Sequence, residues 1–127
     1  LTSEIMEEIS HVISANKFAK KSNENLISAI SYIKKNYRGD LSLERVAGNV
    51  FVSSYYLSHL FRDELNMTFS DYVNKVRMDA AIKLMKETKM SIQEISEQCG
   101  FSDAGYFTRI FKKYHGITPK KYMSLYF

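Results

Sequence analysis

Apolar residues recur every three or four positions along most of this chain, the spacing that places them on one face of an α-helix. Between residues 23 and 38, Leu26, Ile30 and Ile33 follow this spacing, and Gly39 then supplies a residue type that ends helices. A single proline and five glycines interrupt the pattern. The sequence therefore predicts an all-α fold.

Residues that cap helix N-termini precede the other apolar faces. A capping side chain accepts a hydrogen bond from an N–H of the first turn, so its position predicts where a helix begins. One longer helix is expected at about residues 69–87, and a last short helix is expected to begin at Pro119. The predicted caps are Ser42, Ser53, Thr68, Ser91 with Glu94 in a capping box, and Ser102.

The chain contains one structural unit twice. Residues 41–73 align with residues 90–123 when one extra residue is allowed near Ala104. Each copy has a short helix, a turn of about three to four residues and a capped second helix, the pattern of a helix-turn-helix. We expect the first at about residues 42–65 and the second at about 91–114. The repeated positions are Ser42, Ser53, Phe61, Thr68 and Tyr72 in the first copy, and Ser91, Ser102, Phe111, Thr118 and Tyr122 in the second.

The second helix of a helix-turn-helix enters the major groove of DNA, so its outer side must be polar. In the first copy, Ser58 and His59 suit base edges, and Tyr55 suits a thymine methyl group or a phosphate. In the second copy, Arg109 suits a bidentate contact to guanine O6 and N7. The alternative interpretation of both polar faces is an ordinary solvated helix surface without a DNA contact. The outward residues are Ser54, Tyr55, Ser58, His59 and Arg62 in the first copy, and Ala104, Gly105, Tyr106, Thr108, Arg109 and Lys112 in the second.

Two further groups predict contacts to phosphates. Ser53 and Ser102 are expected to be N-caps, and a capped N-terminus near DNA also points backbone N–H groups at phosphate. Near the end of the chain, lysines would anchor DNA without reading its sequence and would make binding depend on salt. These lysines are Lys112, Lys113, Lys120 and Lys121.

Positive charge is concentrated at the end of the chain. The 127 residues carry 18 Lys and Arg against 14 Asp and Glu, a net charge of +4. Residues 104–127 hold five of the basic side chains and no acidic one, whereas residues 1–103 are close to neutral. We therefore expect the second copy to supply more of the electrostatic anchoring and the first copy more of the varied base contacts.

Several classes of function lack their sequence signals. The single cysteine, Cys99, excludes an intramolecular disulfide and lies in an apolar stripe, so it is expected in the core. The histidines have no zinc-ligand spacing, and no nucleophile elbow, P-loop or dinucleotide fingerprint occurs. No apolar run is long enough to span a bilayer. The sequence predicts a cytoplasmic, non-enzymatic protein that uses no metal or cofactor and does not enter a membrane.

The stretch SIQEISEQCGFSDAGYFTRIFKKYHGITPKKY, residues 91–122, resembles the AraC/XylS-type transcriptional regulators, and the resemblance covers about residues 25–125. It implies two helix-turn-helix units joined by a long helix, in a protein that contacts promoter DNA and RNA polymerase, mostly as an activator. By position, it implies base contacts at Ser54, Tyr55, Ser58, His59, Ala104, Gly105, Tyr106 and Arg109, and backbone contacts near Ser53, Arg62, Thr108 and Lys112.

Two features depart from this pattern. Ala104 and Gly105 offer few hydrogen bonds, so readout by the second copy is expected to rest largely on Arg109. The first turn, Val50-Phe51-Val52, lacks the glycine that the second turn has at Gly100, which leaves its geometry open.

The first 22 residues are expected to form a segment ahead of a DNA-binding domain at residues 23–127. Such a segment could couple to a sensor or receiver domain missing from this chain, as in response regulators with this type of output domain, or pair with its copy in a homodimer. Packing on its own domain is the alternative. The chain does not begin with Met, which predicts a fragment of a longer protein. Within the first 22 residues, the apolar spacing predicts a helix with one apolar face, formed by Ile5, Ile9, Val12 and Ile13.

The favoured function is a sequence-specific DNA-binding transcriptional regulator. A connecting helix of roughly 18–20 residues spans about 27–30 Å, close to the turn of B-DNA, about 34 Å, that separates successive major grooves. A single chain could then insert both recognition helices into successive major grooves. Two alternatives fit the same residues: a DNA-targeting module of a larger repair enzyme, and a helical protein-interaction module.

Overall fold

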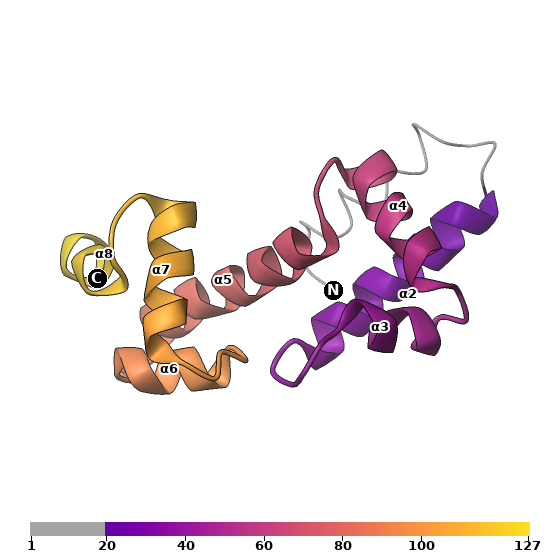
Figure 1. Ribbon diagram of the computed structural model, residues 1–127. Coiled ribbons are helices and arrows are strands. Elements are labelled where there is room, and N and C mark those ends of the chain that lie inside the picture. Colours follow the sequence, from indigo (N-terminus) through magenta and orange to yellow (C-terminus); the bar gives the residue numbers. More distant parts are fainter. Residues whose placement is uncertain (1–19) are drawn as a thin grey trace. The chain divides into compact units, whose positions relative to one another are not determined.

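The computed structural model describes residues 20–127, and this part of the chain is helical without strands (Figure 1). The all-α prediction is confirmed for these residues. The N-terminal helix expected around Ile5 and Ile9 lies outside them. The helices are α2 (Lys20–Asn36), α3 (Leu43–Asn49), α4 (Ser54–Leu65), α5 (Phe69–Glu87), α6 (Ile92–Gln98), α7 (Ala104–His115) and α8 (Pro119–Tyr126).

The described residues divide into two compact units. Residues 20–35 and 41–72 form the first unit, and residues 36–40 with 73–127 form the second. In the first unit α3 packs on α4, and in the second α6 packs on α7. Each unit therefore contains one of the two helix pairs that the internal repeat predicts.

The core of the first unit includes buried side chains from α2, from α4 and from the first turn of α5. Leu26, Ile30 and Ile33 on α2 are almost completely buried, as their spacing predicts. On α4, the buried ring of Phe61 lies 5.5 Å from the ring of Tyr72 in the first turn of α5. These large buried side chains fix the orientation of α4, so its opposite face is presented to solvent.

The core of the second unit contains aromatic side chains together with sulfur-containing ones. Phe107 and Phe111 on α7 are fully buried, and their rings lie 5.8 Å apart. Because these two residues are four positions apart, they fix one face of α7 toward the core. The buried cluster consists of Met78, Ala81, Met85, Ile95, Cys99, Phe101, Phe107 and Phe111.

Most helices begin at the residue that the sequence predicts. The Ser91 hydroxyl accepts a hydrogen bond from the Glu94 N–H at 3.1 Å, and the Ser91 N–H donates to Glu94 Oε1 at 3.1 Å, which completes the capping box. These bonds hold the pKa of the Glu94 carboxyl below its ordinary value. The other predicted caps that accept such a bond are Ser42, Ser53 and Thr68, and Thr118 caps α8 directly before Pro119.

The turn between α6 and α7 requires glycine. Gly100 has φ +94°, and a Cβ atom there would overlap the carbonyl oxygen of Tyr37. That carbonyl belongs to the second unit and accepts a hydrogen bond from Arg77 Nε at 2.9 Å. A second bond, from the same guanidinium to the Gly39 carbonyl at 3.0 Å, completes the attachment. Residues 36–40 are thereby held against α5 and the α6–α7 turn.

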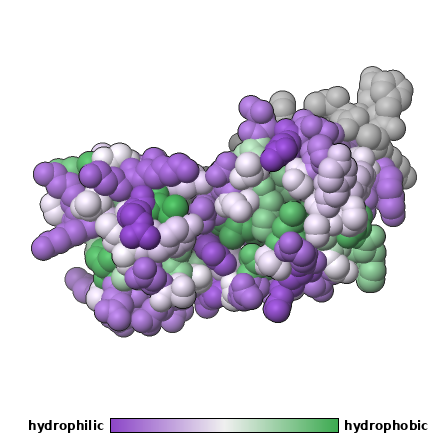
Figure 2. Space-filling view, in the orientation of Figure 1, coloured by the Kyte–Doolittle hydropathy of each residue, from purple (hydrophilic) through white to green (hydrophobic). Residues whose placement is uncertain are grey.

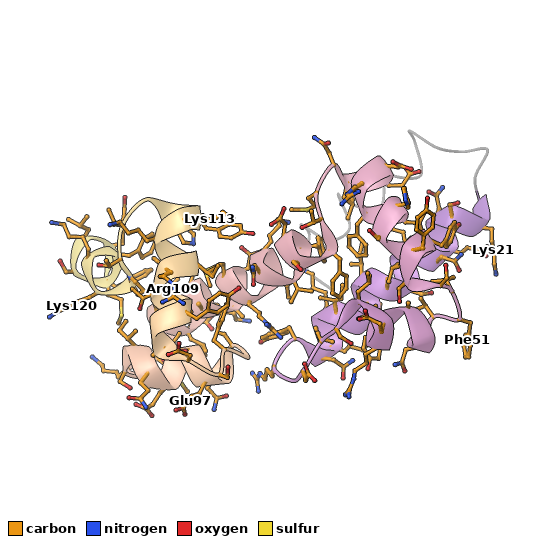
Figure 3. The ribbon with its side chains drawn as sticks, in the orientation of Figure 1. Lys21, Phe51, Glu97, Arg109, Lys113 and Lys120 are labelled. Carbon is orange, nitrogen blue, oxygen red and sulfur yellow. The ribbon has the colours of Figure 1, made fainter. Side chains whose placement is uncertain are left out.

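The turn between α3 and α4 takes the same kind of conformation without glycine. Phe51 has φ +61°, in the left-handed region that costs a residue with a side chain roughly 1–2 kcal/mol. Its side chain is 93% exposed and projects away from α3 and α4 (Figure 3). The geometry that the sequence left open at this turn is therefore a strained backbone with an unpacked ring.

Replacing Phe51 with glycine should stabilise the first unit. Relief of the left-handed strain outweighs the greater chain entropy of glycine, so the free energy of unfolding in urea should rise by about 0.5–1 kcal/mol. Phe51→Ala keeps the Cβ atom and its strain while removing the ring, so its stability should stay near that of the parent. Equal stabilisation by both variants would place the strain in the ring and not in the backbone.

Candidate nucleic-acid interface

The outer face of α4 carries the predicted contacts of the first copy. Ser53 caps the helix, with its hydroxyl accepting from the Tyr56 N–H at 3.1 Å. Tyr55 is 76% exposed, and its ring lies 4.3 Å from that of His59 one turn later. Arg62 is exposed, whereas Ser54, Ser58 and His59 are half-buried.

This face offers varied hydrogen-bonding groups and little positive charge. In the last turns of α4, Arg62 is followed by Asp63 and Glu64, so the helix carries one basic and two acidic side chains. Phosphate anchoring depends on cationic side chains. α4 therefore carries no net positive charge for phosphate anchoring.

The predicted N-cap of α7, Ser102, is wrong by one residue. Asp103, and not Ser102, is the N-cap of α7, and its Oδ1 accepts from the Gly105 N–H at 3.0 Å. Ser102 is exposed and precedes the cap. The physical reason lies in the turn, which has five residues between α6 and α7 but four between α3 and α4.

The position of Asp103 could have been found from the core spacing. Val46 and Ile95 are 49 positions apart, whereas Leu57 and Phe107 are 50 apart. The extra residue of the second copy therefore lies within the turn, before α7 begins at Ala104. Because a cap moves with the helix that it serves, the carboxylate takes the position that Ser53 holds in the first copy.

The outer face of α7 carries the predicted contacts of the second copy. Gly105 is exposed and Ala104 half-buried, and neither has a polar side-chain atom. The Thr108 hydroxyl donates to the Ala104 carbonyl at 3.0 Å, so its proton is used within the helix. Arg109 is exposed in the middle of α7 (Figure 3), and Tyr106 beside it is 42% exposed.

Basic side chains continue along α7 and into α8. Lys112 and Lys113 are exposed in the last turns of α7, and Lys120 and Lys121 are exposed in the first turn of α8. Figure 2 shows hydrophilic side chains over much of the face that these helices present, with smaller apolar patches between them. The second unit thus carries an exposed arginine and several exposed lysines, side chains of the kind that contact phosphates without reading sequence.

The predicted contacts fall into two groups, one in each unit. Ser53, Ser54, Tyr55, Ser58, His59 and Arg62 lie together at and along α4, whereas Ser102, Ala104, Gly105, Tyr106, Thr108, Arg109, Lys112 and Lys113 lie together before and along α7.

The described residues carry no further cluster of reactive or metal-binding side chains. Cys99 is buried in the core as expected, and burial raises the pKa of its thiol to about 11. Within residues 20–127, no three His, Cys, Asp or Glu side chains are grouped so that they could hold a metal ion. Over the same residues, every helix is too short or too polar to cross a membrane.

Comparison with known proteins gives matches across most of the chain. The family model described as a helix-turn-helix domain matches residues 46–124. The uncharacterized HTH-type transcriptional regulator YijO of Escherichia coli is 35% identical over 105 residues, which are 82% of this chain and 37% of that protein. The chain spans about a third of the length of such curated relatives.

Two solved structures share the fold at higher coverage. The C-terminal domain of AraT, a response regulator from Geobacillus stearothermophilus, is 36% identical with a TM-score of 0.77, over 80% of this chain and 84% of that one. An AraC-type DNA-binding domain-containing regulator from Chromobacterium violaceum is 30% identical with a TM-score of 0.76, over 83% and 94% of the two chains. This chain therefore belongs to the AraC-type family of helix-turn-helix domains.

Proposed function

We propose that this chain is the part of a transcription regulator that recognises a specific DNA sequence, with α4 and α7 as the recognition helices. The observation that carries the proposal is the outer face of α7. Arg109, Lys112 and Lys113 are exposed there, opposite the buried Phe107 and Phe111. A helix with this division fits the major groove with its polar side while its core side holds it to the domain.

The two helices have complementary roles in this proposal. α4 supplies neutral groups for base edges and α7 supplies Arg109 with the cationic surface. The connecting α5 is a single helix of 19 residues, about 28 Å long. We propose that the chain reads two half-sites whose centres are about 10 base pairs apart, one turn of B-DNA.

The partners follow from the same proposal. The DNA is double-stranded promoter DNA, and RNA polymerase is the second partner if binding activates transcription. The relatives are more than twice as long as this chain, which supports a sensor or receiver domain outside it. We also propose that the region before α2 couples to that domain or forms a homodimer, and that the chain acts by binding in the cytoplasm, without catalysis.

Selection of bound duplexes from a random library tests the proposal directly. We expect one enriched motif with two conserved blocks about 10 base pairs apart, and an affinity that falls with salt. A motif with one block would remove the second recognition helix from the proposal. Absence of enrichment, or binding that does not depend on salt, would contradict specific DNA recognition.

Lys112→Ala should weaken binding to every sequence by a similar factor. The exposed ammonium group of Lys112 suits a phosphate, so its loss should make the slope of log affinity against log salt shallower by about 1. Titrations of the selected duplex and a scrambled duplex at several salt concentrations measure both effects. Lys21→Ala on α2 is the control and should change neither. A loss confined to the selected duplex would instead make Lys112 a base contact.

A further inference from the structure

Tyr106 lies between the core of the second unit and Arg109. Its ring centre is 5.9 Å from that of Phe101, which is only 4% exposed. On its other side, Arg109 Cζ lies 5.7 Å from the centre of the same ring, within the roughly 6 Å at which a guanidinium is attracted to an aromatic face. A buried residue therefore supports an aromatic ring that in turn supports an exposed cation.

If Arg109 reads a base as proposed above, its side chain needs such support, because its small neighbours on α7 offer none. Its side chain has several rotatable bonds, and ordering a free arginine on binding costs up to about 2 kcal/mol of rotamer entropy. Ala104 and Gly105 are too small to brace it from the first turn, and Thr108 is bonded to the backbone. A bidentate contact to guanine also needs the planar guanidinium in one orientation.

We propose that Tyr106 is a positioning residue that holds Arg109 in its guanine-reading orientation and so sets the base preference of the second half-site. The inference rests on the proposed DNA recognition and changes the expected part of Tyr106, from a base contact to a support. At the position read by Arg109 the preferred base pair is G·C, because a bidentate arginine contact selects guanine O6 and N7.

The first unit has a related pair with different members. Tyr55 packs on His59 four positions later, whereas Tyr106 packs on Arg109 three positions later. By core spacing Tyr55 corresponds to Gly105, so the two pairs are not repeated copies. Each recognition helix has its own aromatic ring beside its polar reader.

Two substitutions separate the aromatic face from its bulk. Tyr106→Phe keeps the ring and its contact with Phe101, and Tyr106→Leu keeps apolar bulk without an aromatic face. We measure affinities for the duplex selected by the parent chain and for its three variants at the base pair read by Arg109. Tyr106→Leu should lower the preference for guanine about 2–5-fold, the effect of losing one exposed cation–π contact, whereas Tyr106→Phe should match the parent.

The same substitutions in the Arg109→Ala background decide between positioning and other roles. A positioning residue has no effect there, so Tyr106→Leu should leave the remaining affinity unchanged. An equal loss in both backgrounds would overturn the proposal, because it would show a base contact by Tyr106 itself or a general weakening of the fold. Loss of guanine preference in Tyr106→Phe would overturn it as well.

A measurement without DNA separates this inference from the proposed function. In the free chain, NMR should show the δ protons of Arg109 shifted upfield by the Tyr106 ring, with the shift kept in Tyr106→Phe and lost in Tyr106→Leu. Absence of the shift would overturn the positioning role even if the chain binds DNA. A clear shift in a chain that selects no DNA motif would instead refute the proposed function, and the inference with it.

Discussion

Replacing Gly100 with alanine is expected to destabilise the second unit more than any other glycine substitution among the described residues. The left-handed backbone costs about 1–2 kcal/mol and the forced overlap with Tyr37 about 1–3 kcal/mol, giving a loss of about 2–5 kcal/mol. Neither neighbour can move cheaply, because the carbonyl is backbone and Arg77 is bonded to it. Urea denaturation followed by circular dichroism measures the loss.

Gly116→Ala is the matched control for this prediction. Gly116 ends α7 with φ +81°, but a Cβ atom there meets nothing within 4 Å. Its substitution should cost only the left-handed strain, about 1–2 kcal/mol. If both variants lose the same stability, the packing of residues 36–40 on the α6–α7 turn does not contribute to the fold in solution.

Replacing Arg109 with alanine is expected to cause the largest loss of sequence discrimination. The bidentate contact to guanine contributes about 1–3 kcal/mol, so the selected duplex should bind roughly 5–150-fold more weakly. Preference should relax at one base pair and remain at the others. Competition titrations with single-base variants of the selected duplex measure this.

Lys113→Ala is the control on the same helix, since Lys113 is exposed one turn after Arg109 (Figure 3). This substitution should lower the affinity for the selected and the scrambled duplex by the same factor, as expected of a phosphate contact. If Arg109→Ala also lowers the affinity for all sequences equally, Arg109 binds phosphate, and base readout by α7 must come from another residue.

The helices and their inner faces could be predicted from the sequence because their signals are local. The pair Ser91 and Glu94, three positions apart, predicts the start of α6. The spacing of Phe107 and Phe111 predicts the buried face of α7. The repeat then turned separate helices into two helix-turn-helix units. The exposed polar faces of α4 and α7 could then be predicted as the sides opposite the buried apolar residues.

The parts that could not be predicted depend on contacts between distant residues or on fine turn geometry. Gly100 is required by a carbonyl 63 positions earlier, and no local pattern announces Tyr37 or its bond to Arg77. No local pattern marks the cap at Asp103 either, and only a comparison of the core spacing in the two copies places it. At Phe51 the residue type itself would mislead, because phenylalanine rarely adopts the left-handed conformation that the chain has there.

The buried thiol of Cys99 provides the second unit with a chemical reporter of its own opening. It is the only cysteine in the sequence, and a pKa of about 11 keeps it almost entirely protonated near neutral pH. A thiol-specific reagent should therefore react only when the core of the second unit opens. Its labelling rate would report the local stability of that unit separately from unfolding of the whole chain.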